Sequence, residues 1–364
     1  MGQAASPRRH EFGLGANLAL LLLSVLVGLA TMELAYRAWR DPRLLIDWPN
    51  FIEQNRHPPE SARYDEVLGF VLDRNVRGAD ENTDAGGFRV TPPLPAGAPV
   101  GRPIVAVGDS FAYGMGVKDN ETWPAYLQQQ TGWRTINAGA KGYGFDQSVL
   151  HAERLAHEVE PSVIVLSFIT DDLRRSELSR VWNLPKPYFE LVDGEPVLRN
   201  VPVPHGDRDV LTFWQRALGW SVLAERFWPA LQAIQDETFG RRERALPEGS
   251  GEAVACALTR QLAAIGLPVL VVAQYDSRPW SDPAQDRGDQ HRQALRILAC
   301  AHAAGLLTLD TFDGLDHVLR VHDRGVAYGN VDVHHNAFGN RLVAKLVGDA
   351  LDKAEFRPDH IEAK

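Results

Sequence analysis

Residues 104–114 read Ile-Val-Ala-Val-Gly-Asp-Ser-Phe-Ala-Tyr-Gly. The first four are apolar without alternation, which is typical of a short strand buried on both faces of a parallel sheet. The chain then passes through Gly108 and Asp109 and presents Ser110 directly before a helix-like stretch. Ligand sites in open α/β sheets lie at the carboxyl ends of strands, so Ser110 is a candidate nucleophile. On this stretch alone, a plain helix-capping role for the serine is equally open.

Strand-like and helix-like segments alternate after this point. The strand-like segments are 104–107, 134–137, 163–168, 268–274 and 306–309, and the helix-like segments are 121–131, 147–159, 253–265, 290–304 and 337–353. This order predicts a mainly parallel sheet covered by helices on both faces. The expected fold is therefore a three-layer α/β/α sandwich of the flavodoxin-like kind.

An uncharged stretch of 21 residues, 12–32, lies near the N-terminus. As a helix it would measure roughly 32 Å, enough for a bilayer core of about 30 Å. It is longer than the apolar region of a cleaved signal peptide, which is the alternative. We expect a transmembrane signal anchor at 12–32 after a short tail at 1–11. Three arginines follow the span and two precede it, which favours a cytoplasmic body, whereas the short tail favours a body outside the cytoplasm, our prediction.

The rest of the chain divides into a connecting region at 33–100 and a main domain at 101–356. The connecting region ends in a proline-rich stretch that favours extended chain. An interval at 173–252 interrupts the alternation and is expected to hold helices of its own. Its aromatic residues suit a lid, a membrane-facing surface or packing against the region that joins the anchor to the main domain. They include Phe213, Trp214, Trp220, Phe227 and Trp228.

Composition excludes several classes of protein. The 364 residues are 45% hydrophobic and carry a net charge of −9, so nucleic acid is not an expected partner. Two cysteines, Cys256 and Cys300, are too few for a disulfide scaffold. Both lie in helix-like stretches, so we expect buried free thiols, with one disulfide as the alternative if the region is extracytoplasmic.

Two further motifs follow predicted strands. The first, residues 137–144, contains Gly142, whose backbone N–H could approach a substrate oxygen because no Cβ obstructs it. The second is Thr170-Asp171-Asp172, whose carboxylates suit an acid–base pair, a metal pair or a helix cap.

The last motif is Asp332-Val333-His334-His335-Asn336, just before the final helix-like segment. A serine hydroxyl needs a base, and an imidazole oriented by a carboxylate meets that need. A surface histidine pair and a partial metal site are the alternatives, although no further metal-ligand motif is present.

Together these motifs resemble the SGNH/GDSL hydrolase superfamily, in particular its membrane-anchored bacterial members. The resemblance covers roughly residues 103–350. It implies that Ser110 is the nucleophile, that Gly142 contributes to the oxyanion hole, and that Asp332 and a histidine complete the triad. The family spacing D-x-x-H selects His335, whereas alignment on the following Asn-x-x-Gly selects His334, which we prefer.

One position departs from the family pattern. Where the family has an asparagine that donates to the oxyanion, this chain has Asp171. An ionised aspartate only accepts hydrogen bonds. Either Asp171 is protonated, or Asn137 or Thr170 donates in its place, or activity is weak or lost.

The resemblance implies a serine-dependent ester hydrolase acting on acyl esters of carbohydrates or lipids in the cell envelope. It implies no metal and no organic cofactor. The alternatives are an acyltransferase that uses the same site and a non-catalytic envelope scaffold or glycan-binding module, which the replacement at position 171 motivates.

Overall fold

The computed structural model describes residues 14–48, 50, 62–94, 96, 101–181, 184–205, 213–227, 242–281, 288–329 and 333–356. The chain forms two units. One combines residues 1–57 with 209–239, and the other combines 58–208 with 240–364. The predicted tail at 1–11 lies outside the described residues.

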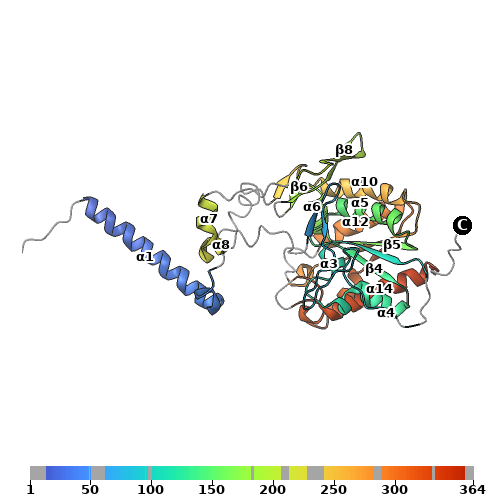
Figure 1. The fold of residues 1–364 in the computed structure, drawn as a ribbon, viewed down its shortest axis with the longest axis horizontal. Coiled ribbons are helices and arrows are strands. Elements are labelled where there is room, and N and C mark those ends of the chain that lie inside the picture. The colour runs from blue at the N-terminus through green and yellow to red at the C-terminus, as the bar shows by residue number, and fades with distance from the viewer. Residues whose placement is uncertain are drawn as a thin grey trace, which may run out of the picture. The chain divides into compact units, whose positions relative to one another are not determined.

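A five-stranded parallel sheet forms the centre of the larger unit (Figure 1). In spatial order its strands are β12 (Leu307–Asp310), β11 (Val269–Ala273), β5 (Val163–Phe168), β3 (Ile104–Gly108) and β4 (Thr135–Gly139). Every residue of β3, β5 and β11 is buried. Apolar and polar residues do not alternate in these strands because both faces of the strands are covered by other parts of the protein.

Helices cover both faces of this sheet, which completes the predicted three-layer sandwich (Figure 1). One layer contains α5 (Phe145–Glu158), α10 (Gly251–Ala263) and α12 (Asp289–Ala303), and the other contains α4 (Trp123–Thr131) and α14 (Ala337–Lys353). Successive strand residues enter different cores. Val105 and Val107 pack in the larger core, whereas Ile104 and Ala106 pack in the smaller one, as the strand period of two requires.

Several short elements join these layers. They are α3 (Ser110–Tyr113), η2 (Asp119–Glu121), α6 (Thr170–Arg175), α11 (Arg278–Ser281), α13 (Phe312–Leu319) and η3 (Arg324–Val326). The connecting region adds a hairpin of β1 (Ala62–Asp65) and β2 (Gly69–Leu72). The Arg154 guanidinium on α5 holds this hairpin by bonding both carboxylate oxygens of Asp65, at 2.7 and 2.8 Å.

The expectation of free thiols was wrong, because Cys256 and Cys300 form a disulfide. The two cysteines lie on α10 and α12, which pack side by side, and their Cα atoms are 5.3 Å apart. That separation is ordinary for a disulfide. The alternative, one disulfide, is what the structure shows; the sequence did not favour it because it does not show which helices become neighbours.

The interval at 173–252 contains strands as well as helices. An antiparallel sheet contains β10 (Arg242–Arg244), β6 (Leu178–Val181) and β7 (Leu184–Pro185), and a hairpin pairs β8 (Tyr188–Val192) with β9 (Glu195–Arg199). The expectation of a helical insertion was therefore wrong for its first part. A fully buried pair, Lys186 Nζ to Asp146 Oδ2 at 2.5 Å, fixes this part to the start of α5.

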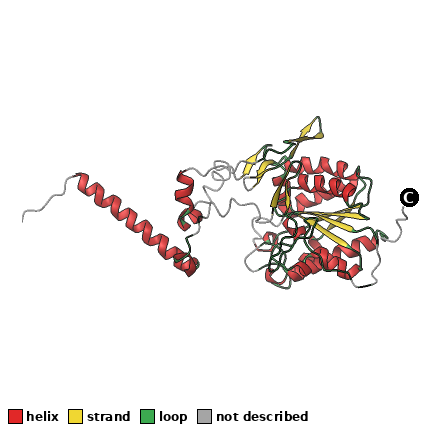
Figure 2. Cartoon of the chain, viewed as in Figure 1, coloured by secondary structure: helices red, strands yellow, loops and turns green. Residues whose placement is uncertain are grey.

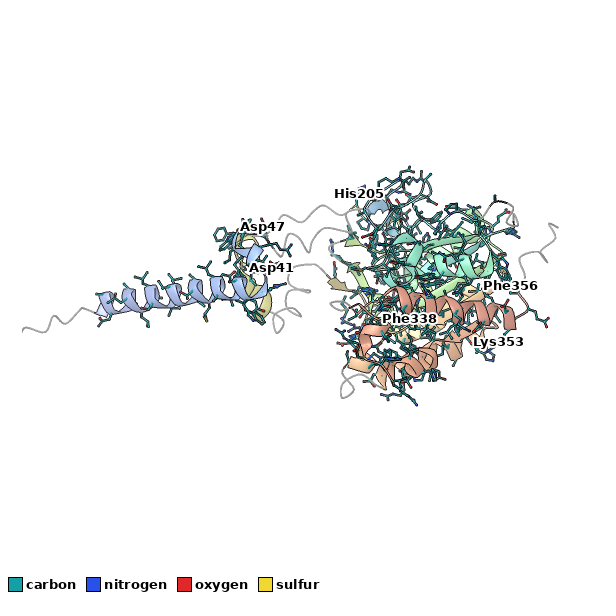
Figure 3. All side chains as sticks on the ribbon, turned by 90° about the horizontal axis from the view of Figure 1, so that it is seen from below. Asp41, Asp47, His205, Phe338, Lys353 and Phe356 are labelled. Atoms are coloured by element: carbon teal, nitrogen blue, oxygen red, sulfur yellow. A yellow bond between two sulfur atoms is a disulfide. The ribbon has the colours of Figure 1, made fainter. Side chains whose placement is uncertain are left out.

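The smaller unit contains α1 (Leu14–Arg40), η1 (Pro42–Leu45), α7 (Phe213–Gly219) and α8 (Val222–Phe227) (Figure 2). Residues Gly15–Arg40 form a helix long and apolar enough to cross a membrane, with a mean hydropathy of 2.3 in its best window. The helix is longer than the predicted span of 12–32. Its side chains project on every side in Figure 3, and none in that window is buried.

The aromatic part of the insertion packs against the end of α1. The Glu33 carboxylate accepts hydrogen bonds from the backbone N–H groups of Val222 and Leu223, at 2.7 and 3.0 Å, and thereby caps α8. Arg37 donates to the Trp220 carbonyl and lies 3.8 Å from the centre of the Trp48 ring. These contacts are made by backbone groups of the insertion, whereas the Phe213 and Trp220 side chains are 74% and 46% exposed, so the role of the aromatic side chains stays a prediction.

Candidate active site

The nucleophile candidate lies at the carboxyl end of β3, on a backbone turn that requires glycine. Gly108 has a φ of +149°, and a Cβ there would lie 2.4 Å from the Ser167 carbonyl oxygen. Asp109 then caps α3, because its Oδ1 accepts from the Phe111 N–H at 2.9 Å. Ser110 is the first residue of α3, where backbone N–H groups have no partner inside the helix.

Among the residues that the structure describes, Ser110 Oγ has two hydrogen-bond partners. His334 Nε2 lies 2.8 Å away and Asp109 Oδ2 lies 3.3 Å away. The hydroxyl carries one proton, so it donates to only one of them at a time. Donation to His334 is the arrangement that a serine nucleophile needs.

The loop that carries His334 is held in place by Asn336. The Asn336 Oδ1 atom caps α14 by accepting from the Gly339 N–H at 3.0 Å. Its Nδ2 atom donates to the carbonyls of Gly325, at 3.0 Å, and Tyr328, at 3.2 Å. One side chain thus joins the helix start to the chain that precedes the histidine.

His335 lies in a different environment. It is only 4% exposed and packs between the rings of Phe111 and Tyr328, with centroids 5.2 and 4.8 Å away. Within the described residues, neither of its ring nitrogens has a hydrogen-bond partner. Burial, and then the neighbouring His334, lower the pKa of His335 to about 3, so the ring is neutral near pH 7. The structure therefore brings His334, and not His335, to Ser110.

The orienting carboxylate expected at Asp332 lies outside the described residues. Gly142 is buried and has a φ of +79°, a backbone conformation that favours glycine. The preceding residue fixes this turn, because Lys141 Nζ lies 2.5 Å from Glu81 Oε2.

Asp171 forms ion pairs with two arginines on its own helix. Its Oδ2 lies 2.7 Å from Arg175 Nη2, and its Oδ1 pairs with Arg174. Asn137, one of the proposed substitutes for the missing donor, uses one amide hydrogen in a bond to the Tyr113 carbonyl at 3.2 Å. The negative charge of Asp171 is thus partly balanced by its own neighbours.

Arg175 is a site residue that sequence reasoning missed. Its Nη1 lies 2.6 Å from Asp172 Oδ1 and 3.4 Å from Asp109 Oδ2, the oxygen that also faces Ser110. Burial, and then the charge of Asp109, raise the pKa of Asp172 well above its usual range, which favours its protonated form. The only signal in the sequence is the helical i, i+3, i+4 spacing that places Asp171 and Asp172 beside Arg175.

The described residues contain no group of three or more His, Cys, Asp or Glu side chains that could hold a metal ion. What the site offers is a hydroxyl, an imidazole, glycine-rich turns and a carboxylate–guanidinium cluster. The first three suit acyl-transfer chemistry, in which a serine attacks a carbonyl and backbone N–H groups stabilise the resulting oxyanion.

Comparisons with known proteins found distant structural likenesses. No family model matches the chain, and no curated protein matches it in sequence. Among solved structures, it is similar to a lipolytic G-D-S-L family protein from Veillonella parvula (14% identity, TM-score 0.39, covering 69% of this chain and 98% of the other). An acetylxylan esterase from Geobacillus stearothermophilus is similar at 13% identity and TM-score 0.42 (72% and 98%), and the acetyl xylan esterase AlAXEase at 17% and 0.41 (68% and 99%).

Proposed function

We propose that the chain is a serine-dependent carboxylic ester hydrolase. The observation that carries the proposal is the 2.8 Å separation between Ser110 Oγ and His334 Nε2 at the carboxyl end of a parallel sheet. The two residues are 224 positions apart in the sequence. An imidazole in hydrogen-bond reach of an otherwise weak nucleophile is the diagnostic geometry of nucleophilic catalysis.

In the proposed reaction, Ser110 Oγ attacks the acyl carbonyl while His334 Nε2 takes its proton. The backbone N–H groups of Ser110 and Gly142 stabilise the tetrahedral oxyanion. His334 then returns the proton to the departing alcohol, which leaves an acyl-serine. A water molecule, activated by the same imidazole, releases the acid and restores the serine. Asp332 is proposed to hold the imidazole in the required tautomer.

The proposed substrates are acyl esters on carbohydrates or lipids of the cell envelope. Two features support a body outside the cytoplasm. The apolar helix α1 suits a membrane anchor, and the disulfide between Cys256 and Cys300 suits an oxidising compartment. The proposed location is therefore membrane-anchored, with the catalytic body periplasmic or otherwise extracytoplasmic.

The test is hydrolysis of short nitrophenyl esters by the full-length protein in detergent, with Ser110→Ala as the comparison. Loss of the nucleophile should lower turnover by about 10⁴-fold or more. Equal rates for both proteins would contradict the proposal and favour a scaffold. Adding a sugar alcohol as a second acceptor distinguishes a transferase, because acyl-sugar product would then form at the expense of free acid.

A further inference from the structure

Part of the connecting region lies beside the edge strand β4, next to the two segments that carry the candidate oxyanion donors, Ser110 and Gly142. Arg89 donates its backbone N–H to the Asn137 carbonyl on β4, at 3.0 Å. The Arg89 side chain is fully buried, and its Nη2 donates to the Val117 carbonyl at 2.8 Å. A buried guanidinium is stable only where its donors find acceptors, so these bonds fix the connecting region to the chain that follows α3.

Glu81, in the same part of the connecting region, bonds to both segments. Its Oε2 atom accepts from the Tyr113 hydroxyl at 3.0 Å and from Lys141 Nζ at 2.5 Å. Tyr113 is the last residue of α3, which begins with Ser110. Lys141 directly precedes Gly142. One carboxylate oxygen therefore joins the helix of the candidate nucleophile to the turn that carries the second oxyanion donor.

The groups around this carboxylate keep it charged and in place. The Glu81 and Lys141 side chains are only 32% and 19% exposed, so solvent screens their attraction less than that of a fully exposed pair. Lys141 Nζ and the guanidinium carbon of Arg89 each lie 4.5 Å from the centre of the Tyr113 ring. Burial alone would raise the pKa of Glu81, but the hydrogen bond and charge of Lys141 outweigh it and lower the pKa below its ordinary value of 4.5. Glu81 is therefore ionised near pH 7.

The proposed reaction requires two donors from separate segments to reach one oxygen. Such donors are effective only when they lie about 2.7–3.1 Å from the oxyanion. The two segments are packed tightly, because a Cβ on Gly139 would overlap the Tyr113 backbone nitrogen. We propose that Glu81 is a positioning residue, whose carboxylate holds α3 and the Gly142 turn at the separation at which the N–H groups of Ser110 and Gly142 meet the same oxyanion. This inference rests on the proposed function, because it concerns the same reaction.

The test is steady-state hydrolysis of a short nitrophenyl ester by the full-length protein in detergent. Glu81→Gln keeps the size of the side chain and an acceptor for Tyr113, but it removes the charge that holds Lys141. Its kcat should fall by about 10–100-fold while KM changes less than about twofold, since a displacement of about 1 Å can cost about 10²-fold in rate. Lys141→Met breaks the same link from the other side and should lower kcat similarly.

Combining the two substitutions shows whether they act through one link. The double variant should be no slower than the slower single variant, whereas independent effects would multiply. Circular dichroism and thermal unfolding give the folded fraction, so that kcat is compared per folded molecule. Glu190→Gln is the matched control, because it removes the acid of an exposed ion pair on β8, and it should keep the wild-type kcat.

The outcomes separate the role of Glu81 from the proposed function. An unchanged kcat in Glu81→Gln or in Lys141→Met, a change confined to KM, or multiplied effects in the double variant would overturn the role of Glu81. Ser110→Ala would still report separately on the proposed hydrolase. No Ser110-dependent hydrolysis by the wild type would overturn both.

Discussion

Ser110 shares its surroundings with a cluster of charges that a plain catalytic triad does not contain. Asp109 Oδ2 faces both the serine hydroxyl and Arg175, and Arg175 also bonds Asp171 and Asp172. A lone ionised carboxylate beside the oxyanion would oppose the reaction. In the proposed reaction the Arg175 guanidinium would offset part of that charge, so the proposal accommodates an aspartate at position 171, although the aspartate supplies no donor.

Replacing Asp171 by asparagine tests this interpretation. Asp171→Asn should hydrolyse nitrophenyl esters as fast as the wild type or faster, because the amide can donate where the carboxylate cannot. Asp171→Ala, which leaves the position without a donor, is the control and should be slower than the asparagine variant. A loss beyond about 100-fold in Asp171→Asn would mean that the carboxylate itself has a catalytic task.

The central strands of the main sheet could be predicted because their sequences are almost continuously apolar. Residues 163–168 and 337–353 begin and end where expected, and the other predicted strands of the sheet and the helices that pack on it agree within about two residues. Continuous apolar runs identify strands that are buried on both faces. Strands β6, β8 and β9 escaped prediction because they are partly exposed and lack such runs.

The capping of α8 by Glu33 gives a prediction about an element. Glu33→Ala removes the acceptor for two helix N–H groups, which should cost about 0.5–2 kcal/mol. Amide exchange in residues 222–227, measured by mass spectrometry on the full-length protein, should therefore become several-fold faster. Glu190→Ala, which removes an exposed ion pair on β8, should leave that exchange unchanged. Equal exchange in Glu33→Ala and the wild type would contradict the capping role.

The link between the β1–β2 hairpin and α5 should respond to pH. Burial alone would raise the pKa of Asp65, but hydrogen bonds from Arg154 and from the N–H groups of Leu68 and Val67 outweigh it and lower the pKa to about 2, from an ordinary value of 3.8. A carboxyl group whose pKa is lower in the folded protein than in the unfolded chain stabilises the fold at pH values above its unfolded pKa. This contribution should be complete above about pH 5 and disappear as the pH falls toward 2.

The measurement for Asp65 is denaturant unfolding of the wild type and Asp65→Asn across this range. The wild type should be more stable at pH 7, and the difference should shrink steadily between pH 4 and pH 2. A difference that is as large at pH 2.5 as at pH 7 would show that the carboxylate charge does not contribute.

At the scale of the whole molecule, parallel topology explains why distant motifs meet. The carboxyl ends of β3, β4 and β5 lie at one edge of the sheet, so the segments that follow them gather there. The sequence predicted that Ser110 and the loop before the last helix would be neighbours on this basis and on the family resemblance. It did not identify Arg175 and gave the disulfide only as an alternative, because both depend on which side chains face each other after helices pack.

The disulfide is expected to stabilise the whole fold. It closes a loop of 44 residues, which corresponds to about 4 kcal/mol in the loop-entropy model. Cys256→Ala combined with Cys300→Ala should therefore unfold at markedly lower denaturant concentration than the wild type. Protein isolated from cells under alkylating conditions should carry no alkylated cysteine. Full alkylation of both cysteines would contradict the extracytoplasmic location.

The most direct test of the account asks whether His334 activates Ser110. A fluorophosphonate probe, followed by peptide mapping of the full-length protein, should label Ser110 in the wild type. His334→Ala should reduce labelling to the level of Ser110→Ala, whereas His335→Phe, which keeps an aromatic ring in the pocket, should retain it if circular dichroism shows native structure. Absence of label on Ser110 in the folded wild type, or equal labelling in His334→Ala, would contradict the proposed enzyme.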